Sequence, residues 1–598
     1  MLAGFVYVNS DAGWQPAKPG RNSSGWPVPD PKCPMPATAQ SLHARGFKMG
    51  LYSALSSVQC GVAPGGLYHE DIDAAAYASW GLDYLKYDNC AEYALEPNAR
   101  STPMRDALNR THRPILFSTE PFHLTPNPQA HISNLWRTTT DVAADVFKVR
   151  VNIDLNDKWA EYAGPGGFND PDMLQCGKGK STLNQHRSNF ITWSIAKAPL
   201  LLSANLTDLA EKFPSLLKLL TNADVIAINQ DPMGVQARKI QVDGLPIGKL
   251  VGVERCAEPD MMAAAAATVG SQGEHNSMRE VNAAKQQWSA VPVPGSATGA
   301  VQFRHGFYAG RCLSVQPPNP IAYNPPYRHP TRPHPRPVWS AHWQAVLSPC
   351  DSSDPKQRWS FLSPGLFPSE KKNLFSRRTL SALINEAASI GNASALTVLP
   401  ETDSRYGVNH VGSSALEYPD AEGQCKTRGC EQYAPSQMWV HDAVTGQILS
   451  GNYTASINEQ WLTTMVPAPT RRCLQAIASA DMAGTPAGHT EVWAGPLANG
   501  SLVVALQNRE DQDNTTISVS VAALSEPNAF FSFAMLRAPA ARANGYARGV
   551  PSPPPAAKAY TVHDVLLGKD VGVLQGEERL SAQVATGDTK LFVLRPGS

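Results

Sequence analysis

The chain has 598 residues, an apolar fraction of 42% and 13 tryptophans, enough for several hydrophobic cores in a globular protein of about four domains. Lys plus Arg and Asp plus Glu balance at 51 each, which argues against recruitment of nucleic acid or an anionic membrane by net charge. No apolar run reaches 18 residues, so the sequence predicts no membrane span.

Short apolar strands alternate with helical stretches from residue 4 to about 235. Such alternation predicts a parallel sheet, and seven strands over this length indicate an α/β fold of the (β/α)8 TIM-barrel type that is one strand short. The expected helices are 37–45, 72–80, 187–196 and 209–220. The expected strands are 5–9, 48–52, 82–87, 114–117, 134–137, 167–170 and 199–202.

Composition and pattern change twice after this region, which predicts three domains with boundaries at 1–240, 241–488 and 489–598. The middle domain repeats the spacing Cys350-x6-Gln357-x-Trp359 at Cys430-x6-Gln437-x-Trp439, and Gln286-x-Trp288 adds a third Gln-x-Trp unit. These units resemble the ricin-type β-trefoil lectin module. The long spacers favour a degenerate trefoil-like insert over a competent three-site lectin and leave open whether the insert binds carbohydrate. The last domain alternates as an antiparallel β-sandwich does.

Lys86 and Asp88 end the strand 82–87 and, being two residues apart, project from one face of it. Leu85 and Tyr87 then face the packed side. A charged pair on a buried strand is costly, so it indicates that the strand tip opens into a site.

Polar residues gather at the expected carboxyl ends of the strands, where barrel enzymes carry their chemistry. They are Asp11, Tyr52, Lys86, Asp88, Glu120, Arg137, Asp141, Asp170 and Asp172. Two facing carboxylates are the minimum for cleaving a glycosidic bond. Lys86 favours an ionised Asp88, as a nucleophile requires, and Asp141 is the candidate acid.

Four ordered motifs carry a resemblance to glycoside hydrolase family 27, the α-galactosidase (melibiase) family of retaining enzymes. They are Tyr84–Cys90 (YLKYDNC), Trp136–Val142 (WRTTTDV), Ala163–Leu174 (AGPGGFNDPDML) and Val225–Pro232 (VIAINQDP), and the sandwich motif Glu491–Leu497 (EVWAGPL) follows them. The resemblance implies release of terminal α-linked galactose from oligosaccharides or glycoconjugates, without a cofactor or a metal.

By that resemblance Asp88 is the nucleophile and Asp141 the acid/base, about 5 to 6 Å apart as retention requires. The galactose subsite would consist of Asp11, Tyr52, Lys86, Glu120, Arg137 and Asp172. The resemblance also implies a disulfide between Cys60 and Cys90. The motif Tyr7–Trp14 departs from the family, because Ala12 and Gly13 stand where the family has aspartate and cysteine.

Two alternatives to α-galactosidase activity remain. A chain that lacks the first strand and the second aspartate could be a catalytically impaired carbohydrate-binding protein, or the same chemistry could act on an α-N-acetylgalactosaminide or a β-L-arabinopyranoside. The sequence leaves the oligomeric state open.

Seven Asn-x-Ser/Thr sequons and ten cysteines favour a protein that is secreted, or lysosomal or vacuolar. No leader precedes the first strand, which leads us to expect that the leader is absent from this chain.

Overall fold

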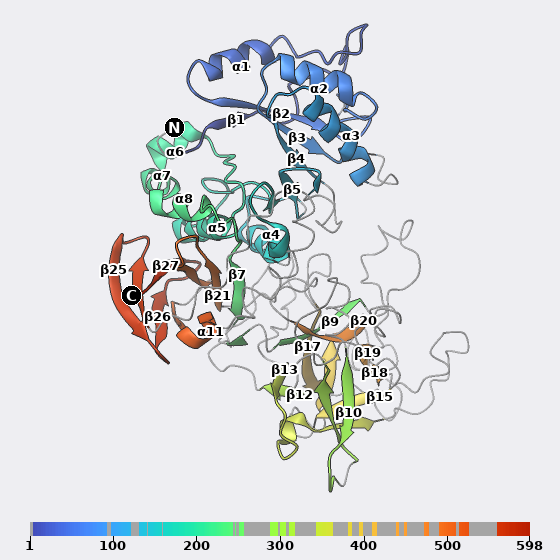
Figure 1. The fold of residues 1–598 in the computed structure, drawn as a ribbon, viewed down its shortest axis with the longest axis vertical. Helices are drawn as coiled ribbons and strands as arrows, with labels where there is room; N and C mark the ends of the chain where they lie inside the picture. Colours follow the sequence, from blue (N-terminus) through green and yellow to red (C-terminus); the bar gives the residue numbers. More distant parts are fainter. Residues whose placement is uncertain are drawn as a thin grey trace, which may run out of the picture.

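The structure is a computed structural model. It describes residues 4–61, 63–91, 97–120, 131–139, 141–157, 159–242, 245–246, 250–255, 287–296, 299–306, 310–316, 343–362, 381–385, 394–398, 409–415, 438–441, 448–450, 472–477, 490–509, 514–525 and 559–597. Figure 1 shows an α/β domain at one end of the molecule, a β-rich middle region at the other, and the C-terminal strands beside helix α5.

The N-terminal α/β domain is built on a parallel sheet of six strands that lie side by side in chain order. These are β1 (Tyr7–Asn9), β2 (Lys48–Ala54), β3 (Tyr84–Asp88), β4 (Leu116–Thr119), β5 (Leu135–Arg137) and β6 (Phe168–Asp170). The strand expected at 199–202 is not formed in the described residues, where Leu202 makes only an isolated parallel bridge to Leu174. The parallel α/β architecture expected from the sequence is confirmed.

Eight helices are described in this domain: α1 (Met35–His43), α2 (Glu70–Ser79), α3 (Pro97–Arg110), α4 (Val146–Asp157), α5 (Leu183–Ile195), α6 (Leu206–Lys212), α7 (Pro214–Leu220) and α8 (Ala223–Asn229). The single helix expected at 209–220 is wrong. Pro214 starts a new helix there, because proline disfavours helical backbone at the preceding residue and lacks the donor that a helix interior needs. Helices α3, α4 and α8 had no counterpart among the expected helices.

The two faces of β3 differ as its alternation predicts. Leu85 and Tyr87 are fully buried in an apolar cluster with Leu51 and Phe117. Lys86 and Asp88 lie on the opposite face, so the tip of this strand carries charge toward a shared edge of the sheet.

The C-terminal domain is a β-sandwich of a seven-stranded and a two-stranded sheet around a separate apolar core. Its larger sheet runs β25-β24-β27-β22-β21-β7-β8, and the smaller one pairs β23 with β26. The elements are β7 (Arg238–Val242), β8 (Leu245–Pro246), β21 (Thr490–Pro496), β22 (Leu502–Asn508), β23 (Thr515–Ser520), α11 (Val521–Ser525), β24 (Ala559–Asp564), β25 (Lys569–Gln575), β26 (Arg579–Val584) and β27 (Thr589–Pro596). Strands β7 and β21 pair although the whole middle region separates them in sequence.

The middle region contributes a twelve-stranded sheet that is separate from the other sheets. Its elements are β9 (Leu250–Arg255), β10 (Trp288–Pro292), β11 (Val301–His305), β12 (Arg311–Gln316), β13 (Trp343–Pro349), β14 (Trp359–Leu362), β15 (Ser381–Asn385), β16 (Ser394–Val398), β17 (Asn409–Ala415), β18 (Met438–His441), β19 (Ile448–Ser450) and β20 (Arg472–Ile477). Of the repeated units, Gln286, Cys430 and Gln437 lie outside the described residues.

The described half of the repeat is a buried unit. Gln357 and Trp359 are almost fully buried, Gln302 donates to the Gln357 amide oxygen at 2.9 Å, and the Trp359 indole donates to the Leu313 carbonyl at 3.1 Å. Cys350, which opens the unit, forms a disulfide with Cys312.

A buried ion cluster joins the α/β domain to the sandwich. Asp154 on α4 contacts Lys239 at 2.6 Å and Arg509 at 2.7 Å, and Glu491 contacts both cations at 2.8 Å. Lys239 and Glu491 are fully buried. A charge buried this deeply is tolerated only when it is paired, so the four side chains fix α4 against β7 and β21.

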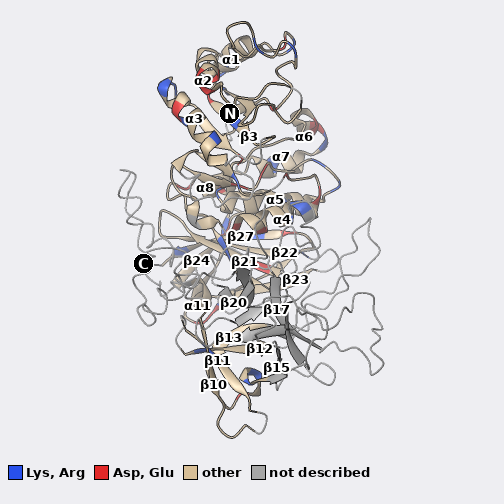
Figure 2. Cartoon of the chain, turned by 90° about the vertical axis from the view of Figure 1, so that its right-hand side faces the viewer, with Lys and Arg blue, Asp and Glu red and all other residues tan. Residues whose placement is uncertain are grey.

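Charges elsewhere are mixed, with Lys or Arg and Asp or Glu interspersed along helices such as α3 and α6 (Figure 2). Among the helices in the described part of the chain, none is both long enough and apolar enough to cross a membrane.

Candidate active site

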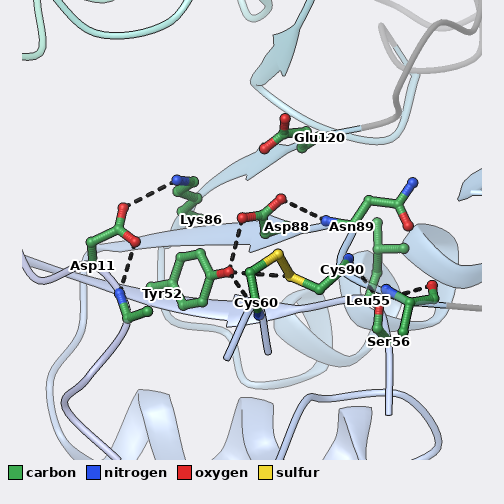
Figure 3. The surroundings of a disulfide bond; sticks show 12 residues. Asp11, Tyr52, Leu55, Ser56, Cys60, Lys86, Asp88, Asn89, Cys90 and Glu120 are labelled. Carbon is green, nitrogen blue, oxygen red and sulfur yellow. Dashed lines mark hydrogen bonds and ion pairs between the residues drawn. A yellow bond between two sulfur atoms is a disulfide. The ribbon is translucent and has the colours of Figure 1, made fainter. Parts of the chain in front are cut away.

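Asp88 ends β3 and is largely buried, with 8% of its surface exposed. The Tyr52 hydroxyl donates to its Oδ2 at 2.8 Å from the neighbouring strand β2, and the Asn89 amide donates to its Oδ1 at 2.7 Å. Figure 3 shows Tyr52 reaching across to Asp88 while Lys86 extends from the same strand as Asp88. These donors hold the carboxylate in one orientation at the carboxyl edge of the sheet.

The surroundings of Asp88 favour its ionised form. Burial by itself raises the pKa of this carboxyl, but hydrogen bonding with Glu120, the charge of Lys86 and the Tyr52 hydroxyl outweigh burial and lower the pKa below its ordinary value. Lys86 also pairs with Asp11 at 3.1 Å, which brings the end of β1 to the same site. An ionised, oriented carboxylate meets the requirement for a nucleophile at neutral pH.

Glu120 follows β4, and its pKa is shifted in the opposite direction from that of Asp88. Burial raises its pKa well above the ordinary value, and the neighbouring Asp88 raises it further, while the charges of Arg137 and Lys86 oppose the rise. In the part of the chain that the structure describes, its Oε1 is buried without a hydrogen-bond partner. The raised pKa favours the protonated form of Glu120, which in that form can donate a hydrogen bond to Asp88.

Arg137, at the end of β5, forms ion pairs with three carboxylates of the site. Its guanidinium contacts Glu120 at 3.3 Å, and Asp141 and Asp172 at 3.1 Å each. Arg137 is nearly buried, whereas the Asp141 side chain is 85% exposed. Asp141 therefore lies at the solvent side of the site, where it is paired with the buried Arg137.

Asp172 adopts a φ of +78°, a backbone conformation that residues other than glycine rarely take. Its carboxylate offsets this strain, because Oδ1 accepts from the Met173 amide and Oδ2 from the Val142 amide, both at 2.7 Å. Val142 directly follows Asp141. Backbone strain of this kind is concentrated at functional sites. The hydrogen bond from Val142 links the tip of β6 to the loop after β5.

The structure thus brings the two expected catalytic carboxylates and the six expected galactose-subsite residues into one connected cluster, in which Glu120 bridges the Asp88 group and the Arg137 group. The cluster also includes Asp170, whose pKa burial raises to about 6 against the charge of Arg137.

Cys60 and Cys90 form the disulfide that the family resemblance implies, and it lies against Tyr52. The two sulfur atoms and a carboxylate oxygen of Asp88 lie within 4.8 Å of one another, a spacing at which such atoms could bind a metal ion. Both cysteines are consumed by the disulfide, so this cluster does not offer thiolates to a metal.

Some supporting residues were not singled out from the sequence. Arg100 in α3 donates to the Leu55 and Ala91 carbonyls and to Asn89, and Ser56 accepts from the Cys90 amide. They hold the backbone that follows Asp88. Alternation and strand-end position signal the residues of the site itself, but no comparable pattern signals a polar residue inside a helix.

Comparison with known proteins accounts for both ends of the chain. The family model described as "Alpha galactosidase A" matches residues 2–231, and that of the "Alpha galactosidase C-terminal beta sandwich domain" matches residues 487–594. Alpha-galactosidase 3 of Arabidopsis thaliana is 40% identical over 246 residues, which cover 40% of this chain and 55% of that protein. The alpha-N-acetylgalactosaminidase of Gallus gallus is 38% identical over 257 residues, covering 40% and 62% of the two chains.

The chain spans little more than half the length of these curated relatives. Among solved structures, alpha-galactosidase I from Mortierella vinacea aligns with 100% of this chain and 88% of its own at a TM-score of 0.50 and 16% identity, a likeness of fold alone. The α/β domain and the sandwich of this chain are thus similar, in the same order, to the two domains of α-galactosidases.

Proposed function

We propose that the protein is a retaining glycosidase that releases terminal α-linked galactose. The observation that carries this proposal is the cluster at the carboxyl edge of the sheet, where a buried, ionised Asp88 lies within a network that reaches Asp141 through Glu120 and Arg137. The similarity of residues 2–231 to α-galactosidases supports the same assignment.

In the proposed reaction, the Asp88 carboxylate attacks the anomeric carbon while Asp141 donates a proton to the leaving oxygen. A covalent glycosyl-enzyme forms, and Asp141 then takes a proton from the water that hydrolyses it. Asp11, Tyr52, Lys86, Glu120, Arg137 and Asp172 would line the galactose subsite. Lys86 and Tyr52 would in addition keep Asp88 ionised.

Two measurements test the proposal. Proton NMR early in the reaction should show galactose released with the α configuration, because a carboxylate nucleophile inverts the anomeric centre twice. First release of the β anomer would contradict it. Comparing 4-nitrophenyl α-galactoside with its α-N-acetylgalactosaminide then assigns the sugar, a comparison made necessary by the Gallus gallus relative.

A pair of variants tests the roles proposed for Asp88 and Asp141. Asp141→Asn should spare substrates with good leaving groups, which need little protonation, whereas Asp88→Asn should fail on all of them. Binding of galactose without turnover by the unmodified chain would instead support the carbohydrate-binding alternative.

We further propose that the parallel sheet is part of a (β/α)8 barrel and that the middle region is a trefoil-like insert. The buried Gln357 and Trp359 and the Cys312–Cys350 disulfide support a folded module there. The two described disulfides and the sequons support passage through the secretory pathway.

A further inference from the structure

Helix α4 presents two asparagines, Asn152 and Asn156, that are both fully buried. Four residues apart on a helix, they lie one above the other on the same face. Asparagine is a poor helix former, and burying its amide without partners is unfavourable. Two buried asparagines on one face therefore indicate specific contacts.

Those contacts are made to the loop between Arg137 and Asp141. Asn152 donates from Nδ2 to the Thr139 hydroxyl at 3.0 Å, and the Thr138 hydroxyl donates to Asn156 Oδ1 at 2.6 Å. Asn152 also donates to the Pro171 carbonyl at 3.0 Å, which ties the loop after β6 to the same helix. The two threonines are consecutive and directly follow β5, so helix α4 holds the loop at the point where the chain leaves that strand.

The opposite side of the loop is held by β6. The Thr138 amide donates to the Asp170 carbonyl at 2.9 Å. Thr138 is thus fixed through its backbone to the sheet and through its hydroxyl to α4.

Helix α4 is itself fixed from behind. Asp154 lies between the two asparagines in sequence, and at about 100° per residue its side chain projects about 200° away from that of Asn152. There it enters the ion cluster with Lys239 and Arg509. The helix is therefore a rigid support between the sandwich and the loop.

We infer that Asn152 and Asn156 are positioning residues for the Arg137–Asp141 loop, holding it so that Asp141 reaches the glycosidic oxygen. This inference rests on the proposed function. Asp141 needs such support because its side chain is 85% exposed, although it pairs with Arg137 at 3.1 Å. A general acid must come within hydrogen-bond reach of its oxygen, and misplacement by about 1 Å can lower the rate about 100-fold.

The test exploits the dependence on leaving group. We replace Thr138 and Thr139 together by valine, which keeps their shape and removes both hydroxyls, and in a second protein by serine, which keeps the hydroxyls. A third protein carries Asn152→Leu and Asn156→Leu. Each is assayed in the full chain on 4-nitrophenyl α-galactoside, whose leaving group needs little protonation, and on methyl α-galactoside, whose leaving group needs much.

The valine and leucine variants should lose about 10-fold or more in kcat on the methyl glycoside, a part of the roughly 10² to 10⁴-fold that acid catalysis contributes, while kcat on the nitrophenyl glycoside and KM change little. The serine variant should retain both activities. If the leucine variant does not fold, as its melting curve would show, the valine and serine pair decides alone.

Equal losses on both substrates, no selective loss, or a serine variant as impaired as the valine variant would overturn the inference. The unmodified chain separates this result from failure of the proposed function. If it hydrolyses neither galactoside, the proposed function is wrong and the positioning role falls with it. If it hydrolyses both, only the positioning role is at stake.

Discussion

Replacing Tyr52 with phenylalanine removes a hydrogen bond from the proposed nucleophile without changing the shape of the site. Tyr52 is 1% exposed, and its hydroxyl lies 2.8 Å from Asp88 Oδ2. Its own pKa is raised, by burial first and then by the charge of Asp88, so it remains a protonated donor. The Tyr52→Phe variant therefore loses a donor that favours the ionised form of Asp88.

The magnitude follows from the number of donors. A hydrogen bond to a charged group is worth about 1.5 to 3 kcal/mol, and one pKa unit corresponds to about 1.4 kcal/mol. Asp88 keeps the Asn89 amide, Glu120 and the charge of Lys86, which can compensate in part. We therefore expect the Asp88 pKa to rise by about one unit, the low end of that range.

The assay is the pH dependence of kcat/KM on 4-nitrophenyl α-galactoside. Because the nucleophile must be ionised, its acidic limb should move to higher pH by about one unit in Tyr52→Phe. Tyr87→Phe is a matched control on the adjacent strand, since the Tyr87 hydroxyl is buried without a hydrogen-bond partner in the described residues. An unshifted limb in Tyr52→Phe, or an equal shift in Tyr87→Phe, would refute the reasoning.

Three further predictions concern the carboxylates and the domain joint. Asp88→Asn should abolish turnover while the melting temperature stays near that of the unmodified chain, and residual activity within about 10-fold would contradict its role as nucleophile. Glu120 has a raised pKa, so it stabilises the fold below the ordinary glutamate pKa and loses this contribution as the pH rises through its raised pKa. The melting temperature of Glu120→Gln should accordingly gain on that of the unmodified chain with rising pH, and a constant difference would argue against a protonated Glu120. Deleting residues 245–488 leaves 243, 244, 489 and 490 between the paired residues Val242 and Glu491, a loop length common in hairpins, so the shortened chain should fold cooperatively and keep the proposed galactosidase activity. Failure to fold would show that the insert supports the α/β domain.

The sequence predicted those parts of the site that follow from the alternation of side chains along a strand and from the position of residues at strand ends. Lys86 and Asp88 fall on one face of β3 because side chains alternate along a strand, whatever surrounds it. The contact of Arg137 with Glu120 could not be predicted in this way, since it depends on the spacing of two neighbouring strand ends. The raised pKa of Glu120 depends on burial and on the nearness of Asp88, which exist only in the folded chain.

The contacts by which helix α4 holds the Arg137–Asp141 loop could not be predicted from the sequence either. Asn152 and Asn156 stand in a segment without a clear apolar stripe, and helix α4 gave no amphipathic signal. Its amides became interpretable only once Thr138 and Thr139 lay beside them. The split between α6 and α7, by contrast, was readable from Pro214, whose effect on the preceding residue is local.

The antiparallel pairing of β7 with β21 also bears on the order in which the chain assembles during synthesis. When β7 leaves the ribosome, its partner is still about 250 residues away, a delay of roughly 12 to 50 s at 5 to 20 residues per second. Throughout that interval the backbone groups of β7 and the ammonium of Lys239 lack the strand and the carboxylate that later cover them. The nascent chain thus carries an open strand edge of the kind that chaperones recognise, and folding of the middle region, whose first and last strands β9 and β20 pair, then brings β7 and β21 together.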